Sequence, residues 1–415
     1  MRSRMSNRGF LFALILALAA GFVLAVQPTA ALADTVPTPP EPPTVSVDAL
    51  PTAQVNGVVW AQLVVGNTVW VGGDFTLARP AGAAPGVNTT PRSYLLTYNV
   101  STGVLNSFAP TLNGQVLGLA KSPNGNRVYA VGDFTSINGS NRFRIAAFST
   151  GPTPALISSF TPGINARARS VEATDTTVYV GGSFTAVNGV ARTRLAAFQA
   201  SSVPASDGAL LTWAPSAAGG NGQVMGMALN PARTKLVLGG QFLTLNGASA
   251  IGMGAVDPVS GANVSWNASN LIKNGGTRAA IYSLSQSNGV VYGTGYVFGQ
   301  EAGVPKGNLE GTFAADSATG DIKWIADCHG DHYSAFASNG AVYSVGHAHD
   351  CANLRGFGQT SPDWTFHRGL AMSEVATTTN LQNQVGGYFN FGGQPAPTLL
   401  DWYPDLQAGT FTGQT

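Results

Sequence analysis

Short runs of apolar residues that end at glycine recur along most of this chain. Each run is rich in β-branched and aromatic residues, which is typical of a β-strand, and no long amphipathic helical pattern separates the runs. The clearest four runs are VWVGGDFT (69–76), VYAVGDFTSING (128–139), VYVGGSFTAVNG (178–189) and LVLGGQFLTLNG (236–247). Glycine at the end of each run indicates that the backbone turns where a Cβ atom would clash.

Two further signals recur with a similar period. The stretch NGSNRFRIAAF (138–148) aligns without gaps to NGVARTRLAAF (188–198). One aromatic residue stands near the end of each unit: Phe108, Phe160, Trp213, Trp266, Trp324 and Trp402. The spacings are 52, 53, 53, 58 and 78 residues, so the sixth unit carries an insertion. We expect these aromatic side chains to fill the space between neighbouring units.

Each unit is predicted to contain four short strands. The first strand resembles GQVLGLAKS (114–122), the second ends at the glycines, the third resembles RIAAF (144–148), and the fourth ends at the aromatic residue. Six recognisable four-stranded units of about 50 to 60 residues predict an all-β fold, the β-propeller, in which each unit is one blade.

The repeat also resembles a known family. The stretch GGSFTAVNGVARTRLAAF (181–198) is similar to the delta-60 type repeat of secreted actinobacterial β-propeller proteins, and the residues from DCHGD (327–331) to HRGLA (367–371) look like their late blade. The resemblance covers about residues 50–412 and implies a fold, with no catalytic assignment that carries over. Such proteins often continue into another blade and further modules. Six blades close the ring, with TVSVDAL (44–50) as a closing strand, or a seventh is missing at the C-terminus.

The first residues have the layout of a secretory signal peptide. Three arginines precede an apolar run (9–26), and Ala31-Leu32-Ala33 fits a cleavage site. We therefore predict a signal peptide (1–33), a proline-rich linker (34–44) and a propeller domain (45–415) in a secreted protein. The alternative is an uncleaved anchor helix, because the apolar run is nearly long enough to span a membrane. No later segment is long and apolar enough to do so, so no membrane span is expected after cleavage.

Charge excludes one class of partner. Charged residues make up 10% of the chain and the net charge is +1, whereas about 25% charged residues is typical of soluble domains. No basic stripe is present that could bind nucleic acid.

One segment, 327–351, holds both cysteines and four of the five histidines. In the repeat register, YSAFASNGAVY (333–343) aligns with YSLSQSNGVVY (282–292) of the preceding blade. Cys328 and Cys351 are then brought to the same rim of neighbouring strands, which predicts a disulfide in an exported protein. A Cys-His metal site is the alternative.

The other residues of this segment are candidate ligands for a metal or for another molecule: His329, Asp331, His332, His347 and His349. Imidazole and carboxylate groups suit Zn²⁺ or another divalent metal, which would be the cofactor. The alternative is structural: the histidines hydrogen-bond the loop that the disulfide anchors.

Two repeated sets of polar residues receive structural interpretations. Asp74, Asp133, Ser183, Gln241 and His347 occupy equivalent positions and are expected to cap turns. Arg92, Arg142 and Arg192 are expected to bridge neighbouring blades.

Two classes of function fit these features. The favoured hypothesis is a secreted, non-catalytic binding or scaffold module that recognises an extracellular carbohydrate or protein at one rim. The alternative is a metal-dependent extracellular enzyme that uses the histidine-rich rim of blade six. Propellers serve both purposes, so the fold alone does not decide.

Overall fold

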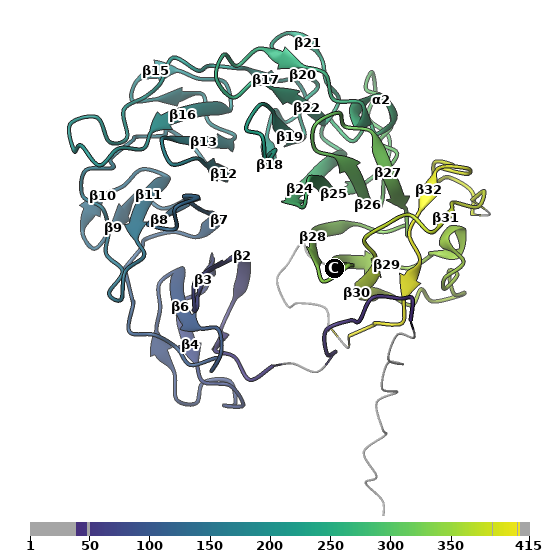
Figure 1. Ribbon diagram of the computed structural model, residues 1–415, viewed down its shortest axis with the longest axis horizontal. Coiled ribbons are helices and arrows are strands. Elements are labelled where there is room, and N and C mark those ends of the chain that lie inside the picture. The colour runs from purple at the N-terminus through teal and green to yellow at the C-terminus, as the bar shows by residue number, and fades with distance from the viewer. Residues whose placement is uncertain (1–38, 48–49, 384, 405, 407–415) are drawn as a thin grey trace, which may run out of the picture. The chain divides into compact units, whose positions relative to one another are not determined.

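The computed structural model describes residues 39–47, 50–383, 385–404 and 406 (Figure 1). The chain divides after Val36 into two units, and the second, which begins at Pro37, contains all the described residues. The predicted signal peptide (1–33) and residues 34–38 of the predicted linker lie outside them. Within the described ranges, no helix is both long enough and apolar enough to cross a membrane.

Six antiparallel sheets follow one another along the chain, and in each sheet the strands pair in chain order (Figure 1). Sheet 1 contains β2 (Val58–Val65), β3 (Thr68–Asp74) and β6 (Leu95–Asn99). Sheet 2 contains β7 (Val116–Lys121), β8 (Arg127–Gly132) and β11 (Ile145–Ser149). Sheet 3 contains β12 (Ala168–Ala173), β13 (Thr177–Gly182) and β16 (Leu195–Gln199).

The last three sheets each have a fourth strand. Sheet 4 contains β18 (Val224–Leu229), β19 (Leu236–Gly240), β22 (Met253–Val256) and β23 (Asn263–Val264). Sheet 5 contains β24 (Ala279–Ser287), β25 (Val290–Val297), β26 (Gly311–Asp316) and β27 (Ile322–Ala326). Sheet 6 contains β28 (His332–Ser338), β29 (Ala341–Ala348), β30 (His367–Ser373) and β33 (Leu399–Leu400).

Short strands and helices occupy the connections. The strands are β1 (Gln54–Val55), β4 (Leu77–Arg79), β5 (Thr90–Pro91), β9 (Ser136–Ile137), β10 (Ser140–Asn141), β14 (Ala186–Val187), β15 (Val190–Ala191), β17 (Ala217–Ala218), β20 (Thr244–Leu245), β21 (Ala248–Ser249), β31 (Thr378–Thr379) and β32 (Pro395–Ala396). The helices are α2 (Ala268–Leu271) and a 3-10 turn (Ala352–Leu354). The predicted all-β class is confirmed.

The prediction of four strands in every unit is wrong for the first three sheets. There the fourth segment makes single bridges, such as Phe148 with Leu156, where a ladder was expected. The predicted role of the three repeated arginines is also wrong. Their guanidinium groups bind carbonyl oxygens of the fourth segment in their own unit, so they do not bridge neighbouring sheets. The pairs are Arg92 with Asn106, Arg142 with Ser158, and Arg192 with Leu211. Sheet 4 has Ala250 at the equivalent position and forms the fourth strand β23.

The repeated aromatic residues pack between neighbouring sheets, as predicted. Phe108 contacts Trp70 of sheet 1 and Phe148 of sheet 2, with ring centroids 5.0 and 5.7 Å away. Trp324 is fully buried between sheets 5 and 6, 6.0 Å from Tyr292. Burial of such large side chains stabilises each interface by about 2–3 kcal/mol per residue.

The first strands of successive sheets pack against one another from β2 through β7, β12, β18 and β24 to β28. They lie on the inner side of the row of sheets (Figure 1). Among the described residues, β28 and β2 do not pack together to a comparable extent. The all-β class is therefore established, and closure into a propeller stays a prediction.

A β-bulge interrupts the same place in every first strand. The inserted residues are Trp60, Leu117, Arg169, Met225, Tyr282 and Tyr333. A glycine of the second strand pairs beside each bulge, and it is the repeated glycine of the sequence motif. A Cβ atom on Gly182 would lie 2.2 Å from the carbonyl oxygen of Arg167, and one on Gly240 would lie 2.0 Å from that of Gln223. The bulge therefore requires glycine at this position.

The predicted closing strand (44–50) does not form a strand in its described part, residues 44–47 and 50. Residues 44–47 lie against sheet 6 instead. The Val45 N–H donates to the Tyr343 hydroxyl at 2.8 Å, and Val47 packs against the apolar cluster of Ala341, Ala371, Leu400 and Trp402.

Candidate functional site

The predicted disulfide joins Cys328 and Cys351, whose Cα atoms are 4.2 Å apart and whose side chains are fully buried. Cys328 lies between β27 and β28, and Cys351 follows β29. The N–H groups of His349 and Asp350 donate to the carbonyls of His329 and Cys328. The two segments therefore run side by side beyond the β28–β29 pair. Because both sulfur atoms are used in the disulfide, the alternative Cys-His metal site is wrong.

His329 lies between two aspartates. Its Nδ1 atom is 3.2 Å from Asp350 Oδ2, and its Nε2 atom is 3.7 Å from Asp327 Oδ2. All three residues are at most 3% exposed. Burial lowers the pKa of His329 although Asp350 opposes this, and burial raises the pKa of Asp327 well above its ordinary value. Both shifts favour the uncharged forms, because burial in surroundings of low dielectric constant disfavours a charged group.

A stack of rings connects His329 to the surface. The Tyr388 ring lies on the His329 ring with 3.8 Å between centroids, and the Tyr388 hydroxyl is 3.3 Å from His349 Nε2. His349 in turn stacks on Trp364 at 4.2 Å. Burial lowers the pKa of His349 to about 4, so the imidazole is neutral at pH 7 and packs as a flat aromatic group.

The outer end of this stack is exposed. Trp364 is 47% exposed and Phe366 is 40% exposed, although both contact the buried His349. They belong to the loop between β29 and β30, which the disulfide anchors at Cys351. We call Trp364, Phe366, Tyr388 and His349 the aromatic rim.

His332 is placed differently from the other candidates. Its Nδ1 atom is 2.8 Å from Ser344 Oγ and 3.3 Å from Thr312 Oγ1, and the residue is 1% exposed. Burial lowers the pKa of His332 to about 3. This neutral imidazole contacts both sheet 5, through Thr312, and sheet 6, through Ser344, so its position supports a structural role.

Asp331 and His347 lie beside Tyr333, and the His347 ring also contacts Phe366 of the aromatic rim, with 5.6 Å between the ring centroids. The backbone N–H of Asp331 donates to His347 Nε2 at 3.0 Å, and the His347 ring lies 6.1 Å from that of Tyr333. The five predicted candidates therefore occupy three different environments.

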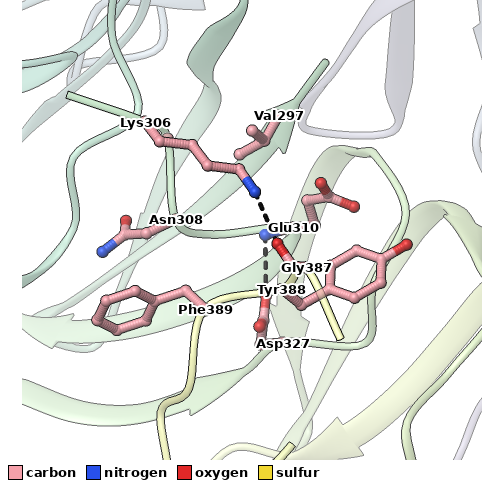
Figure 2. Close-up of a pocket in the computed structure, with 9 residues that line it drawn as sticks. Val297, Lys306, Asn308, Glu310, Asp327, Gly387, Tyr388 and Phe389 are labelled. Atoms are coloured by element: carbon pink, nitrogen blue, oxygen red, sulfur yellow. Dashed lines mark hydrogen bonds between the residues drawn. The ribbon is translucent and has the colours of Figure 1, made fainter. Parts of the chain in front are cut away.

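A small cavity lies beside the aromatic rim, between Glu310, Asp327 and the loop that carries Tyr388 (Figure 2). Its interior of about 20 Å³ has room for about one water molecule. Asp327 accepts a hydrogen bond from the Glu310 N–H at 2.8 Å, and Lys306 Nζ donates to the Gly387 carbonyl at 2.6 Å. Burial raises the pKa of Glu310 to about 7.

Metal binding receives no support from this geometry. In the part of the chain that the structure describes, no group of three or more His, Cys, Asp or Glu side chains is arranged to hold a metal ion. The predicted candidates instead contact aromatic rings, hydroxyl groups and one another.

Sequence reasoning missed Glu310, Trp364, Phe366 and Tyr388. Trp364 and Phe366 offered a signal, because two large aromatic residues in a polar loop, SPDWTF (361–366), are unusual. Glu310 and Tyr388 offered no such signal, because only the fold of the connections that carry them brings them to the site.

A scan of protein-family models finds no match to this chain, and a search of curated proteins finds no relative.

Proposed function

We propose that this protein is a secreted, non-catalytic β-propeller module that binds an extracellular carbohydrate at the aromatic rim. The delta-60 type repeat and six consecutive sheets with packed first strands support the propeller. The disulfide supports an extracellular location, because such bonds persist in oxidising compartments.

The exposure of Trp364 and Phe366 is the observation on which the proposal rests. Exposed apolar patches rimmed by polar residues mark interaction sites, and these two aromatic side chains lie together in a polar loop. Sugar rings present flat apolar faces edged by hydroxyl groups. The face of an indole ring can pack on the apolar face of a sugar, and its N–H can donate to a hydroxyl group. His349 and Tyr388 hold Trp364 in place, so binding would require little ordering of the side chain.

Binding to insoluble polymers tests this proposal. The full chain is incubated with cellulose, chitin or purified peptidoglycan, and the bound fraction is measured as a function of protein concentration. We expect saturable binding to at least one polymer, and about tenfold weaker binding for Trp364→Ala.

The matched control is Phe143→Ala, which removes an aromatic residue of similar exposure, 45%, from the connection between β10 and β11. It should bind as the wild type does. Failure of the wild-type protein to bind all three polymers, or equal binding by both variants, would contradict the proposal.

A further inference from the structure

The six β-bulges place one side chain from each sheet at an equivalent position. A bulge adds a residue that has no partner in the ladder and re-aims its side chain. The last four bulged residues in chain order have large or charged side chains: Arg169, Met225, Tyr282 and Tyr333.

Contacts between sheets that are not neighbours show that these side chains converge. The Arg169 guanidinium carbon of sheet 3 lies 4.8 Å from the ring centroid of Tyr282, which belongs to sheet 5. Tyr282 in turn lies 5.3 Å from Tyr333 of sheet 6 and 6.2 Å from Tyr296 of its own sheet. Arg169, Tyr282, Tyr296 and Tyr333 are therefore one group, which we call the bulge cluster.

Arg169 carries a charge that the described residues leave without an acidic partner. Its guanidinium forms no ion pair with the residues that the structure describes, and it lies over the face of the Tyr282 ring. The planar guanidinium presents five N–H donors, a geometry that matches a carboxylate in two parallel hydrogen bonds. All four residues of the cluster are partly exposed, so a ligand can reach them.

The surroundings favour a ligand with a single negative charge. Asp331 lies beside Tyr333, whose hydroxyl is 3.5 Å from Asp331 Oδ2, and this carboxyl opposes a dianion such as a phosphate monoester. Burial raises the pKa of Asp331, which lessens but does not remove that opposition. The tyrosine rings supply flat apolar surfaces and hydroxyl groups beside the charge.

We propose that the bulge cluster is a second binding site, in which Arg169 binds the carboxylate of an acidic sugar and Tyr282 and Tyr333 contact the sugar ring. This site shares no residue with the aromatic rim, and His347 lies between the two, 6.1 Å from Tyr333 and 5.6 Å from Phe366. The proposal does not depend on the proposed function of the rim. It would let the protein recognise a polymer that contains uronic acid residues.

Titration of the full chain with oligogalacturonate, measured by isothermal calorimetry, tests the site. We expect saturable binding that a neutral oligosaccharide of the same length, such as cellotriose for a trimer, does not reproduce. Arg169→Gln should weaken binding about tenfold or more, because a charge-assisted pair of hydrogen bonds is lost. The affinity of Arg169→Lys should lie between those of the wild type and Arg169→Gln, because lysine keeps the charge and lacks the planar guanidinium group.

Two controls make the result specific. Arg233→Gln removes the same charge from the exposed turn between β18 and β19, at the end of sheet 4 opposite the bulge, and should leave binding unchanged. Trp364→Ala should also bind oligogalacturonate normally, which separates this site from the aromatic rim. Thermal unfolding confirms that each variant is folded. Equal weakening by Arg169→Gln and Arg233→Gln, equal affinity for the neutral oligosaccharide, or no binding by the wild type would overturn the proposal.

Discussion

Glu310 shows how a single side chain can link stability to pH. Its carboxyl accepts a hydrogen bond from the Gly330 N–H at 3.0 Å and lines the small cavity beside Asp327 (Figure 2). Burial raises its pKa from 4.5 to about 7. The folded state therefore binds this proton more tightly than the unfolded state does, so the contribution of Glu310 is fully present below about pH 4.5 and is lost as the pH rises through 7.

Glu310→Gln should consequently be more stable than the wild type at pH 8, because the amide keeps an acceptor for Gly330 and cannot ionise. The difference should shrink as the pH falls toward 4. Melting temperatures measured between pH 4 and 8 check this, with the exposed Glu41→Gln as the control that shows no such trend. A difference that is the same at pH 4 and pH 8 would show that ionisation is not the cause.

The residues of the candidate site were only partly predictable. The disulfide followed from the repeat register, because strand pairing fixes which residues are adjacent. The different surroundings of Asp331 and His347, compared with those of His329 and His349, did not follow. They depend on the bulge at Tyr333 and on the connections after β29 and β31, which no repeat determines.

At the scale of strands, the repeated glycine and the β-bulge belong to one structural feature. The sequence indicated that a Cβ atom would clash, and the structure identifies the clash as a carbonyl oxygen of the bulged first strand. The number of strands was predicted less well. The fourth segments of sheets 1 to 3 form single bridges, and an arginine side chain of the same unit binds one carbonyl group of each. Strand propensity carries no information about these contacts.

Gly182→Ala tests the requirement for glycine. The new Cβ atom would lie 2.2 Å from the Arg167 carbonyl oxygen, so the backbone must shift beside the bulge at Arg169. We expect a loss of about 1–3 kcal/mol in unfolding free energy, observed as a lower melting temperature. Gly151→Ala is the matched control, since no atom lies within 4 Å of its Cβ position. A melting temperature for Gly182→Ala equal to that of the control would refute the steric argument.

At the scale of the whole described unit, the two ends of the row of sheets differ from its interior. Each inner sheet packs on both sides, but sheet 6 leaves Phe336 67% exposed and Val345 39% exposed. Part of sheet 6 is covered by residues 42–47, which approach Gly340, Tyr343 and Trp402. The sequence predicted that this segment closes the fold as a strand. It instead contacts the last sheet through a hydrogen bond of Val45 and through apolar side chains such as Pro42 and Val47, a mode of packing that strand patterns do not encode.

Val47→Asp should release this segment from sheet 6. A carboxylate placed against the apolar cluster that contains Leu400 and Trp402 would be partly removed from water, so the bound position of the segment would lose about 1–3 kcal/mol. We expect faster cleavage of the segment by a dilute protease, stronger quenching of tryptophan fluorescence by acrylamide, and a lower melting temperature. Val45→Asp is the control two residues away. Its side chain is 49% exposed and its backbone N–H donates to the Tyr343 hydroxyl, so a charge on the side chain stays in water. If the two variants behave alike, the packing of Val47 does not hold the segment, and sheet 6 is stable without that cover.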